Sequence, residues 1–171
     1  MPTTLAASLA AKSAPIRDAV RPKPPRFVLM PTYTAERELL APREDVWAFL
    51  SEPTRLADWW PGIQGVHPDR RGLAPGARWQ IHGRARSNAL VGPKFSVPGM
   101  IVFLEVQRPA HVSWRFIDDK YDVELSLRES RPDRTLARLT VSGPIFGGLR
   151  RSIPQRALTQ LHALCQTGDR P

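Results

Sequence analysis

Three consecutive segments in the second half of the chain alternate between apolar and polar residues. They are residues 111–116, 121–128 and 135–142, and within each the apolar residues fall mainly on every second position. Successive side chains of a strand point to opposite faces, so each strand has one apolar and one polar face. Short polar links at 109–110, 118–120 and 131–133 suit hairpins. The pattern predicts an antiparallel meander that is covered on one side.

Other segments extend this sheet and supply the helices that cover it. Strands are predicted at residues 33–40, 63–67, 77–83 and 100–108, and two short helices at 43–51 and 53–60. A longer helix is predicted near the C-terminus, where apolar residues recur at three- and four-residue steps: Leu149, Ile153, Ala157, Leu161 and Leu164. Pro154 predicts either a kink or a helix that begins near Ile153. We expect this helix to lie across the apolar face of the sheet.

A motif follows the first strand. Residues 37–53 read RELLAPREDVWAFLSEP, and residues 58–62 read DWWPG. This run resembles the opening of the START-related superfamily, which includes polyketide cyclase-like proteins, relatives of the birch pollen allergen and lipid-transfer domains. The resemblance implies an α+β helix-grip fold. In that fold a curved seven-stranded antiparallel sheet wraps around a long C-terminal helix, two short helices follow strand one, and a deep apolar cavity can remain. The motif is structural and carries no catalytic residue, so function must be argued separately.

Nearly half of the net positive charge lies before the predicted domain. The chain has 25 Lys and Arg residues against 16 Asp and Glu residues, and residues 1–26 hold five basic residues against Asp18. We expect residues 1–31 to form a basic, proline-containing disordered tail, residues 32–167 the helix-grip domain and residues 168–171 a short C-terminal tail. The tail suits weak contact with an anionic surface, and no specific nucleic-acid binding is expected. It does not read as a signal peptide, which favours a cytoplasmic protein.

The predicted inner faces define a candidate ligand cavity beneath the C-terminal helix. Its expected lining is Trp60, Trp79, Ile81, Val102, Leu104, Trp114, Phe116, Tyr121, Val123, Leu125, Leu139, Ile153, Ala157 and Leu161. The aromatic members either fill the core or form the walls of a binding site. Ile101 and Phe103 compete with Val102 and Leu104 for the inward positions, because a one-residue slip exchanges the two faces of a strand.

Few residues suggest catalysis. Tyr121 and His82 are the candidates for moving protons, although His82 alternates with inward residues and is expected outside. No nucleophile elbow, phosphate-binding loop or zinc-protease motif occurs, and the single Cys165 offers no disulfide or cysteine zinc site. We therefore expect no metal and no cofactor. Residues 84–99 are turn-rich and are predicted to form a gating loop, with residues 143–148 as a flexible joint.

Three function classes remain at this point. The favoured one is a carrier or sensor that buries a hydrophobic small molecule of lipid, polyketide or isoprenoid type, as a monomer or a homodimer. The second is a polyketide cyclase or dehydratase-like enzyme that folds its substrate against the aromatic walls. The third is a protein-interaction module similar to co-chaperone domains of the superfamily. The absence of an obvious inward acid–base pair favours binding over turnover.

Overall fold

A single antiparallel sheet organises the chain. The structure, a computed structural model, describes residues 30–83, 97–144 and 149–167. In chain order the elements of this part are β1 (Thr32–Leu39), α1 (Arg43–Ser51), η1 (Pro53–Arg55), α2 (Leu56–Trp59), β2 (Ile63–Pro68), β3 (Arg78–Gly83), β4 (Val97–Gln107), β5 (His111–Phe116), β6 (Tyr121–Arg131), β7 (Arg134–Ser142) and α3 (Ile153–Thr167). The seven strands are ordered β1-β7-β6-β5-β4-β3-β2, and every neighbouring pair is antiparallel. The predicted α+β helix-grip fold is confirmed.

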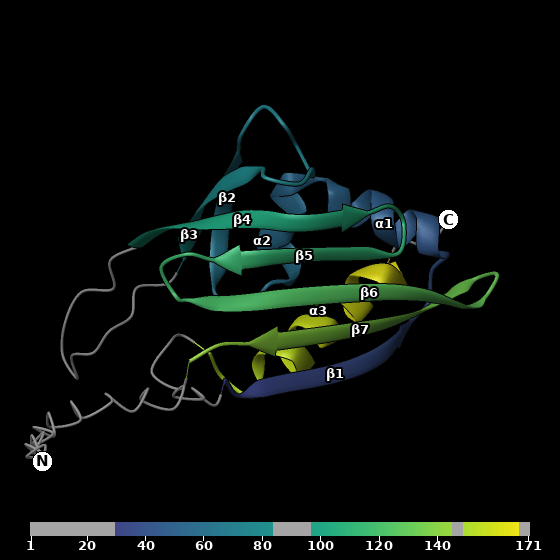
Figure 1. Cartoon of the computed structure of the whole chain (residues 1–171). Coiled ribbons are helices and arrows are strands. Elements are labelled where there is room, and N and C mark those ends of the chain that lie inside the picture. The colour runs from purple at the N-terminus through teal and green to yellow at the C-terminus, as the bar shows by residue number, and fades with distance from the viewer. Residues whose placement is uncertain (1–29, 84–96, 145–148, 168–171) are drawn as a thin grey trace, which may run out of the picture.

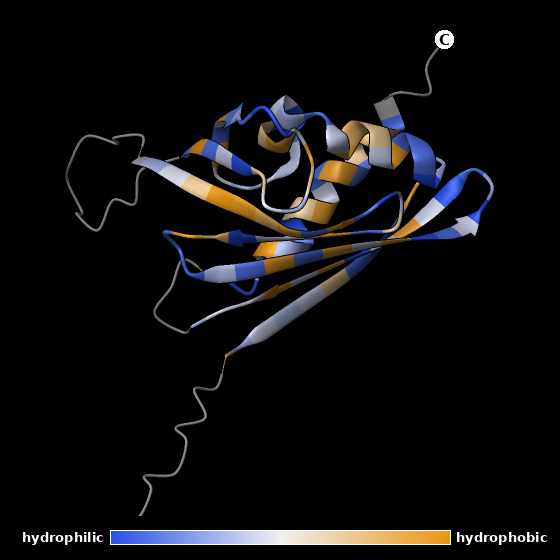
Figure 2. Cartoon of the chain, turned by 45° about the horizontal axis from the view of Figure 1, so that its top comes forward, coloured by the Kyte–Doolittle hydropathy of each residue, from blue (hydrophilic) through white to orange (hydrophobic). Residues whose placement is uncertain are grey.

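The helices form one layer on the inner face of the sheet. The long helix α3 packs against β1 and β7, and α2 packs against β2 and α3. Figure 1 shows α3 behind one half of the sheet and α1 and α2 behind the other half. Hydrophobic and hydrophilic bands alternate along the strands in Figure 2, as expected for a sheet that is covered on one face.

The alternation predicted for β5, β6 and β7 is confirmed by burial. Their inward side chains are each at most 4% exposed: Val112, Trp114, Phe116, Tyr121, Val123, Leu125, Leu127, Ala137, Leu139 and Val141. The residues between them are half-buried or exposed. Several of the outward residues pair across strands, as Arg115 does with Asp122 at 2.6 Å between Nε and Oδ1. Burial of the apolar set therefore determines which face of these strands points inward.

The inward positions predicted for β4 are wrong by one residue. Ile101 is fully buried and Phe103 is 4% exposed, whereas Leu104 is 46% exposed and Val102 is only half-buried. The reason is the pairing with β5, in which Ile101 lies opposite Phe116 and Phe103 opposite Trp114. Directly opposed residues on neighbouring strands point to the same face of the sheet. The inward aromatic residues of β5 therefore determine which residues of β4 point inward. Val102 and Leu104 therefore do not line the interior.

Strand β4 also begins earlier than the sequence predicts. It starts at Val97 instead of Met100, because Val97 pairs with Gly83 and Gly99 with Ile81. Pro98 is tolerated because β5 ends opposite Ile101, so no strand on that side requires its missing N–H. Residues 97–99 of the predicted gating loop therefore belong to β4. Residues 84–96 of that loop lie outside the described residues. So do most of the predicted N-terminal tail and residues 145–148 of the predicted joint.

Helix α3 begins where the proline requires it to begin. Its first residue is Ile153, which places Pro154 in the first turn, where a missing N–H breaks no helical hydrogen bond. The alternative of a kink at Pro154 is therefore excluded by the start of the helix. Three side chains anchor α3 to the sheet with at most 1% exposure: Ala157, Leu158 and Leu161.

A pH-dependent contribution to stability is expected from His162 on α3. Burial lowers the pKa of its imidazole, and the positive charge of Arg37 lowers that pKa further. The unfolded chain then binds a proton more readily than the folded chain, so the free energy of unfolding falls as the pH drops below about 6.5. Urea unfolding between pH 5 and pH 8 measures this slope, and His162→Gln is expected to flatten it. The exposed His67, changed to Gln, is the control, and equal slopes in both variants would contradict the assignment.

Candidate functional site

An aromatic cluster occupies the interior between the helices and the middle of the sheet. We define it by Trp59, Trp60, Trp114, Phe116 and Tyr121. The ring centroid of Trp60 lies 5.4 Å from those of Trp59, Trp114 and Phe116. Phe116 in turn stacks on Tyr121, with centroids 4.4 Å apart and planes 23° apart. Edge-to-face and offset-stacked rings contribute about 0.5–1.5 kcal/mol per pair beyond their area burial, so the cluster is a stabilising unit.

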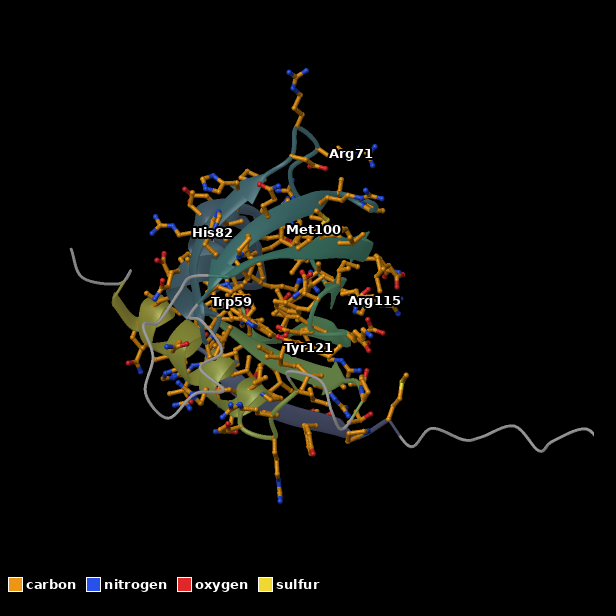
Figure 3. All side chains as sticks on the ribbon, turned by 90° about the vertical axis from the view of Figure 1, so that its left-hand side faces the viewer. Trp59, Arg71, His82, Met100, Arg115 and Tyr121 are labelled. Carbon is orange, nitrogen blue, oxygen red and sulfur yellow. The ribbon has the colours of Figure 1, made fainter. Side chains whose placement is uncertain are left out.

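Local chain geometry brings these rings together. Trp59 ends α2, and Trp60 adopts an extended conformation at φ −85° and ψ 122°. The chain therefore leaves the helix between two adjacent tryptophans, and both of them are 2% exposed. Gly62, with a φ of 93°, supplies the left-handed residue of the turn into β2. Figure 3 shows Trp59 in the interior between strands and helices, with Arg115 on the opposite, outward side of the sheet.

An apolar cavity lies beside the aromatic cluster. Its volume is about 20 Å³, and its wall is formed by Leu50, Leu56, Trp59, Leu73, Trp79, Phe103, Val112, Trp114 and Leu125. A cavity of roughly 10–15 Å³ is the minimum that holds one water molecule. The described side chains therefore fill the interior almost completely. The helical part of the wall comes from α1 and α2, and no residue of α3 belongs to it.

The predicted cavity lining is distributed over two places. Trp79, Trp114 and Leu125 line the cavity. Most of the other predicted residues are buried in the surrounding core: Trp60, Ile81, Phe116, Tyr121, Val123, Leu139, Ala157 and Leu161. Ile153 is half-buried at the start of α3. This cavity thus lies on the α1–α2 side of the interior, away from the position predicted beneath the C-terminal helix.

The predicted lining did not include the remaining wall residues, which are Leu50, Leu56, Trp59, Leu73, Phe103 and Val112. Of these, Phe103 was the alternative inward residue of β4 in the sequence analysis. Leu50 belongs to the apolar stripe of α1, and Val112 to the inward set of β5, so the pattern places both inside. What the pattern lacks is the position of α1 and α2 above the sheet, which long-range packing decides.

The indole nitrogen of Trp114 has an unusual environment. Trp114 is 2% exposed, and its Nε1 has no hydrogen-bond partner in the described part of the chain. The neighbouring wall residue Trp79 instead donates from Nε1 to the carbonyl oxygen of Gly72 at 3.0 Å. A buried donor without an acceptor costs about 1–3 kcal/mol. Trp114 is thus a wall residue of an apolar cavity with a buried donor that has no partner among the described residues.

Tyr121 and His82 are not brought together. Tyr121 is 4% exposed on the inner face of β6. His82 alternates with the inward Trp79 and Ile81 of β3, and its ring meets that of His67 at 5.0 Å between centroids. Figure 3 shows the two candidates well apart. A general acid and base must both reach the same reacting group, so these two residues do not form such a pair.

Two further features of the described residues bear on the chemistry. Within residues 30–83, 97–144 and 149–167, no three His, Cys, Asp or Glu side chains gather as they do around a bound metal ion. Asp118, in the turn between β5 and β6, accepts a hydrogen bond from the backbone N–H of Met100 at 2.9 Å, which is a structural role. Among these same residues, no helix combines the length and apolarity that crossing a membrane requires.

Solved structures with the same fold include both uncharacterised proteins and an enzyme. A norcoclaurine synthase point mutant from Thalictrum flavum, in complex with a transition-state analogue, is 15% identical with a TM-score of 0.60, and the match covers 83% of this chain and 98% of that one. The protein XoxI from Bacillus cereus is 13% identical with a TM-score of 0.59 and coverage of 82% and 99%. A conserved protein of unknown function from Enterococcus faecalis is 19% identical with a TM-score of 0.58 and coverage of 82% and 74%. At these identities the likeness concerns the fold.

Comparison of sequences gives the family. No match was found among the curated protein sequences. The family profile described as polyketide cyclase / dehydrase and lipid transport matches residues 30–162, which is most of the chain and includes the strand, helix and aromatic elements described above. Its fold supports a hydrophobic ligand-binding role in general. The chain belongs to the polyketide cyclase / dehydrase and lipid transport family, within the START-related helix-grip superfamily.

Proposed function

We propose that the protein binds a hydrophobic small molecule of lipid, polyketide or isoprenoid type in its interior and acts as a carrier or sensor. The observation that carries the proposal is the apolar cavity beside the aromatic cluster, whose wall contains an unpartnered Trp114 donor. Apolar walls with a few placed polar groups are typical of small-molecule sites. The family match adds independent support.

A ligand of this size requires the cavity to widen, because the side chains leave room for about one water molecule. The wall formed by α1, η1 and α2 is the part that moves away from the sheet at the lowest free-energy cost. These elements have nine, three and four residues, whereas the opposite wall belongs to continuous strand ladders. Short elements with few hydrogen bonds open at lower free energy than central strands. Ligand entry is thus coupled to displacement of Leu50, Leu56 and Trp59 from the sheet.

Binding without turnover is favoured over the cyclase alternative. Tyr121 and His82 belong to opposite faces of the sheet and provide no joint acid–base site. Burial of apolar surface contributes about 25 cal/mol per Å² and needs no catalytic group. A carrier or sensor therefore needs only the apolar interior that this fold provides.

Native mass spectrometry of the purified protein tests this function. We expect a co-purified apolar molecule that is released on denaturation. We also expect the emission of the five tryptophans, all of them at most 2% exposed, to change on titration with farnesol, monoolein or emodin. Leu56→Phe adds volume at the cavity wall and is expected to abolish the bound mass, whereas Leu104→Phe makes the same change on the outward face and is the matched control. A bare protein mass with unchanged emission for all three compounds would contradict the proposal.

A further inference from the structure

The buried indole of Trp114 is surrounded by rings that cannot accept its proton in an ordinary hydrogen bond. The ring centroid of Trp60 lies at 5.4 Å, that of Phe103 at 6.2 Å and that of Trp59 at 6.3 Å. The indole N–H is a donor only, and neither an indole nor a phenyl ring offers a lone pair as an acceptor. The other wall residues of the cavity are Leu, Val and Trp side chains. Within the described part of the wall, no side chain therefore supplies a nitrogen or oxygen acceptor for Trp114 Nε1.

A trapped water fits this cavity poorly. Buried waters make about three hydrogen bonds, and apolar cavities of this kind stay dry. The wall side chains in residues 30–83 and 97–144 present donors from indoles and otherwise only hydrocarbon. A ligand atom that accepts one hydrogen bond and is attached to an apolar body matches such a wall better than water does.

The lack of charge in the described wall limits which kinds of ligand atom can accept the hydrogen bond from Trp114. Among the residues that the structure describes, the wall contains no Lys, Arg or His. A carboxylate placed there would lose its hydration and gain a single donor, which leaves an ionised group unpaired in an apolar environment. A ketone or ether oxygen loses far less hydration, and one donor satisfies it.

We infer that Trp114 is a specificity-determining residue whose Nε1 donates a hydrogen bond to a neutral carbonyl or ether oxygen of the bound molecule. The site then selects apolar molecules that carry such an oxygen over plain hydrocarbons and over carboxylates. This inference rests on the proposed function and names the class of ligand within it.

Three probes with the same ring system test the selection. They are 2-acetylnaphthalene, 2-ethylnaphthalene and 2-naphthoate, which present a ketone, a hydrocarbon and a carboxylate. We expect the wild-type protein to bind the ketone about tenfold more tightly than the hydrocarbon, the order of magnitude that one net hydrogen bond provides. Binding of the carboxylate is expected to be weaker still. In ¹⁵N-labelled protein, the indole resonance of Trp114 is expected to move downfield with the ketone and to stay in place with the hydrocarbon.

Variants separate the hydrogen bond from the packing. Trp114→Phe keeps an aromatic ring and removes the donor, so it is expected to bind the ketone and the hydrocarbon with equal affinity. Trp47→Phe makes the same change at a tryptophan that is buried but does not line the cavity, and it is expected to keep the wild-type preference. If Trp114→Phe fails to fold, the three-probe comparison and the indole resonance of the wild-type protein decide alone.

The outcomes distinguish the two levels of the proposal. Equal wild-type affinities for ketone and hydrocarbon, with an unmoved Trp114 resonance, would overturn the role of Trp114 and leave hydrophobic binding intact. Tightest binding of the naphthoate would also overturn it. Failure of all three probes, together with a bare mass and no response to farnesol, monoolein or emodin, would overturn the proposed function and this inference together.

Discussion

Replacing Trp60 by alanine is expected to lower the free energy of unfolding by about 3–5 kcal/mol, the usual cost of removing a large buried aromatic side chain. Trp60 is 2% exposed and contacts Trp59, Trp114 and Phe116, so its loss removes three ring pairs and leaves a void at the centre of the aromatic cluster. Urea unfolding followed by circular dichroism measures the change. This is the largest single-residue effect that we predict.

The same variant is expected to acquire a binding site. The void left by Trp60 is apolar and enclosed, and cavities of that kind bind small aromatic molecules. Added indole is therefore expected to raise the melting temperature of Trp60→Ala and to leave that of the wild-type protein unchanged. A loss below about 1 kcal/mol and no rescue by indole would show that the interior is not packed as described, since such a small cost is typical of a surface position.

Replacing Gly143 by alanine is expected to destabilise the fold by about 1–3 kcal/mol through overpacking. A Cβ atom at this position would lie 2.6 Å from Cβ of Tyr121, 2.9 Å from its Cα and 3.0 Å from the carbonyl oxygen of Lys120. Two of these three atoms belong to the backbone of the β5–β6 hairpin, so the strand itself must move. Since Tyr121 stacks on Phe116, the displacement is transmitted to the aromatic cluster.

Gly65→Ala is the matched control for this prediction. Gly65 lies in β2, and a Cβ atom there would meet no heavy atom within 4 Å. Its substitution is expected to change stability by no more than about 0.5 kcal/mol. Equal unfolding midpoints for the two alanine variants would contradict the close approach of residue 143 to the hairpin. Near-ultraviolet circular dichroism, which reports on ordered aromatic side chains, is expected to change only in Gly143→Ala.

The predictable part of the fold follows from local rules. Strict alternation places Val112 and Trp114 on one face of β5, and the same rule holds for β6 and β7. Pro154 marks the start of α3 because it lacks the N–H that a helix interior requires. The run from Arg37 to Pro53 indicated the superfamily, and the family match over residues 30–162 confirms it.

Strand β4 shows where local rules fail. Ile101, Val102, Phe103 and Leu104 are all apolar, so the sequence contains no alternation from which to choose an inward face. Pairing with Trp114 and Phe116 of β5 makes that choice. The sequence likewise does not predict that α1 and α2 contribute to the wall of the small cavity, because which helix packs over which strand depends on contacts between distant segments.

The sequence by itself determined the fold class, the family and the inward faces of three strands, because period-two alternation, proline geometry and a local motif act over a few neighbouring residues. Only the tertiary structure decided which residues of β4 point inward, that the aromatic cluster fills the interior, and that Trp114 Nε1 has no acceptor among the described residues. These features depend on contacts between α2, β4 and β5. Side chains that are far apart in the sequence pack closely in the fold, and this packing produces no periodic pattern in the sequence. It can therefore be read only from the folded structure.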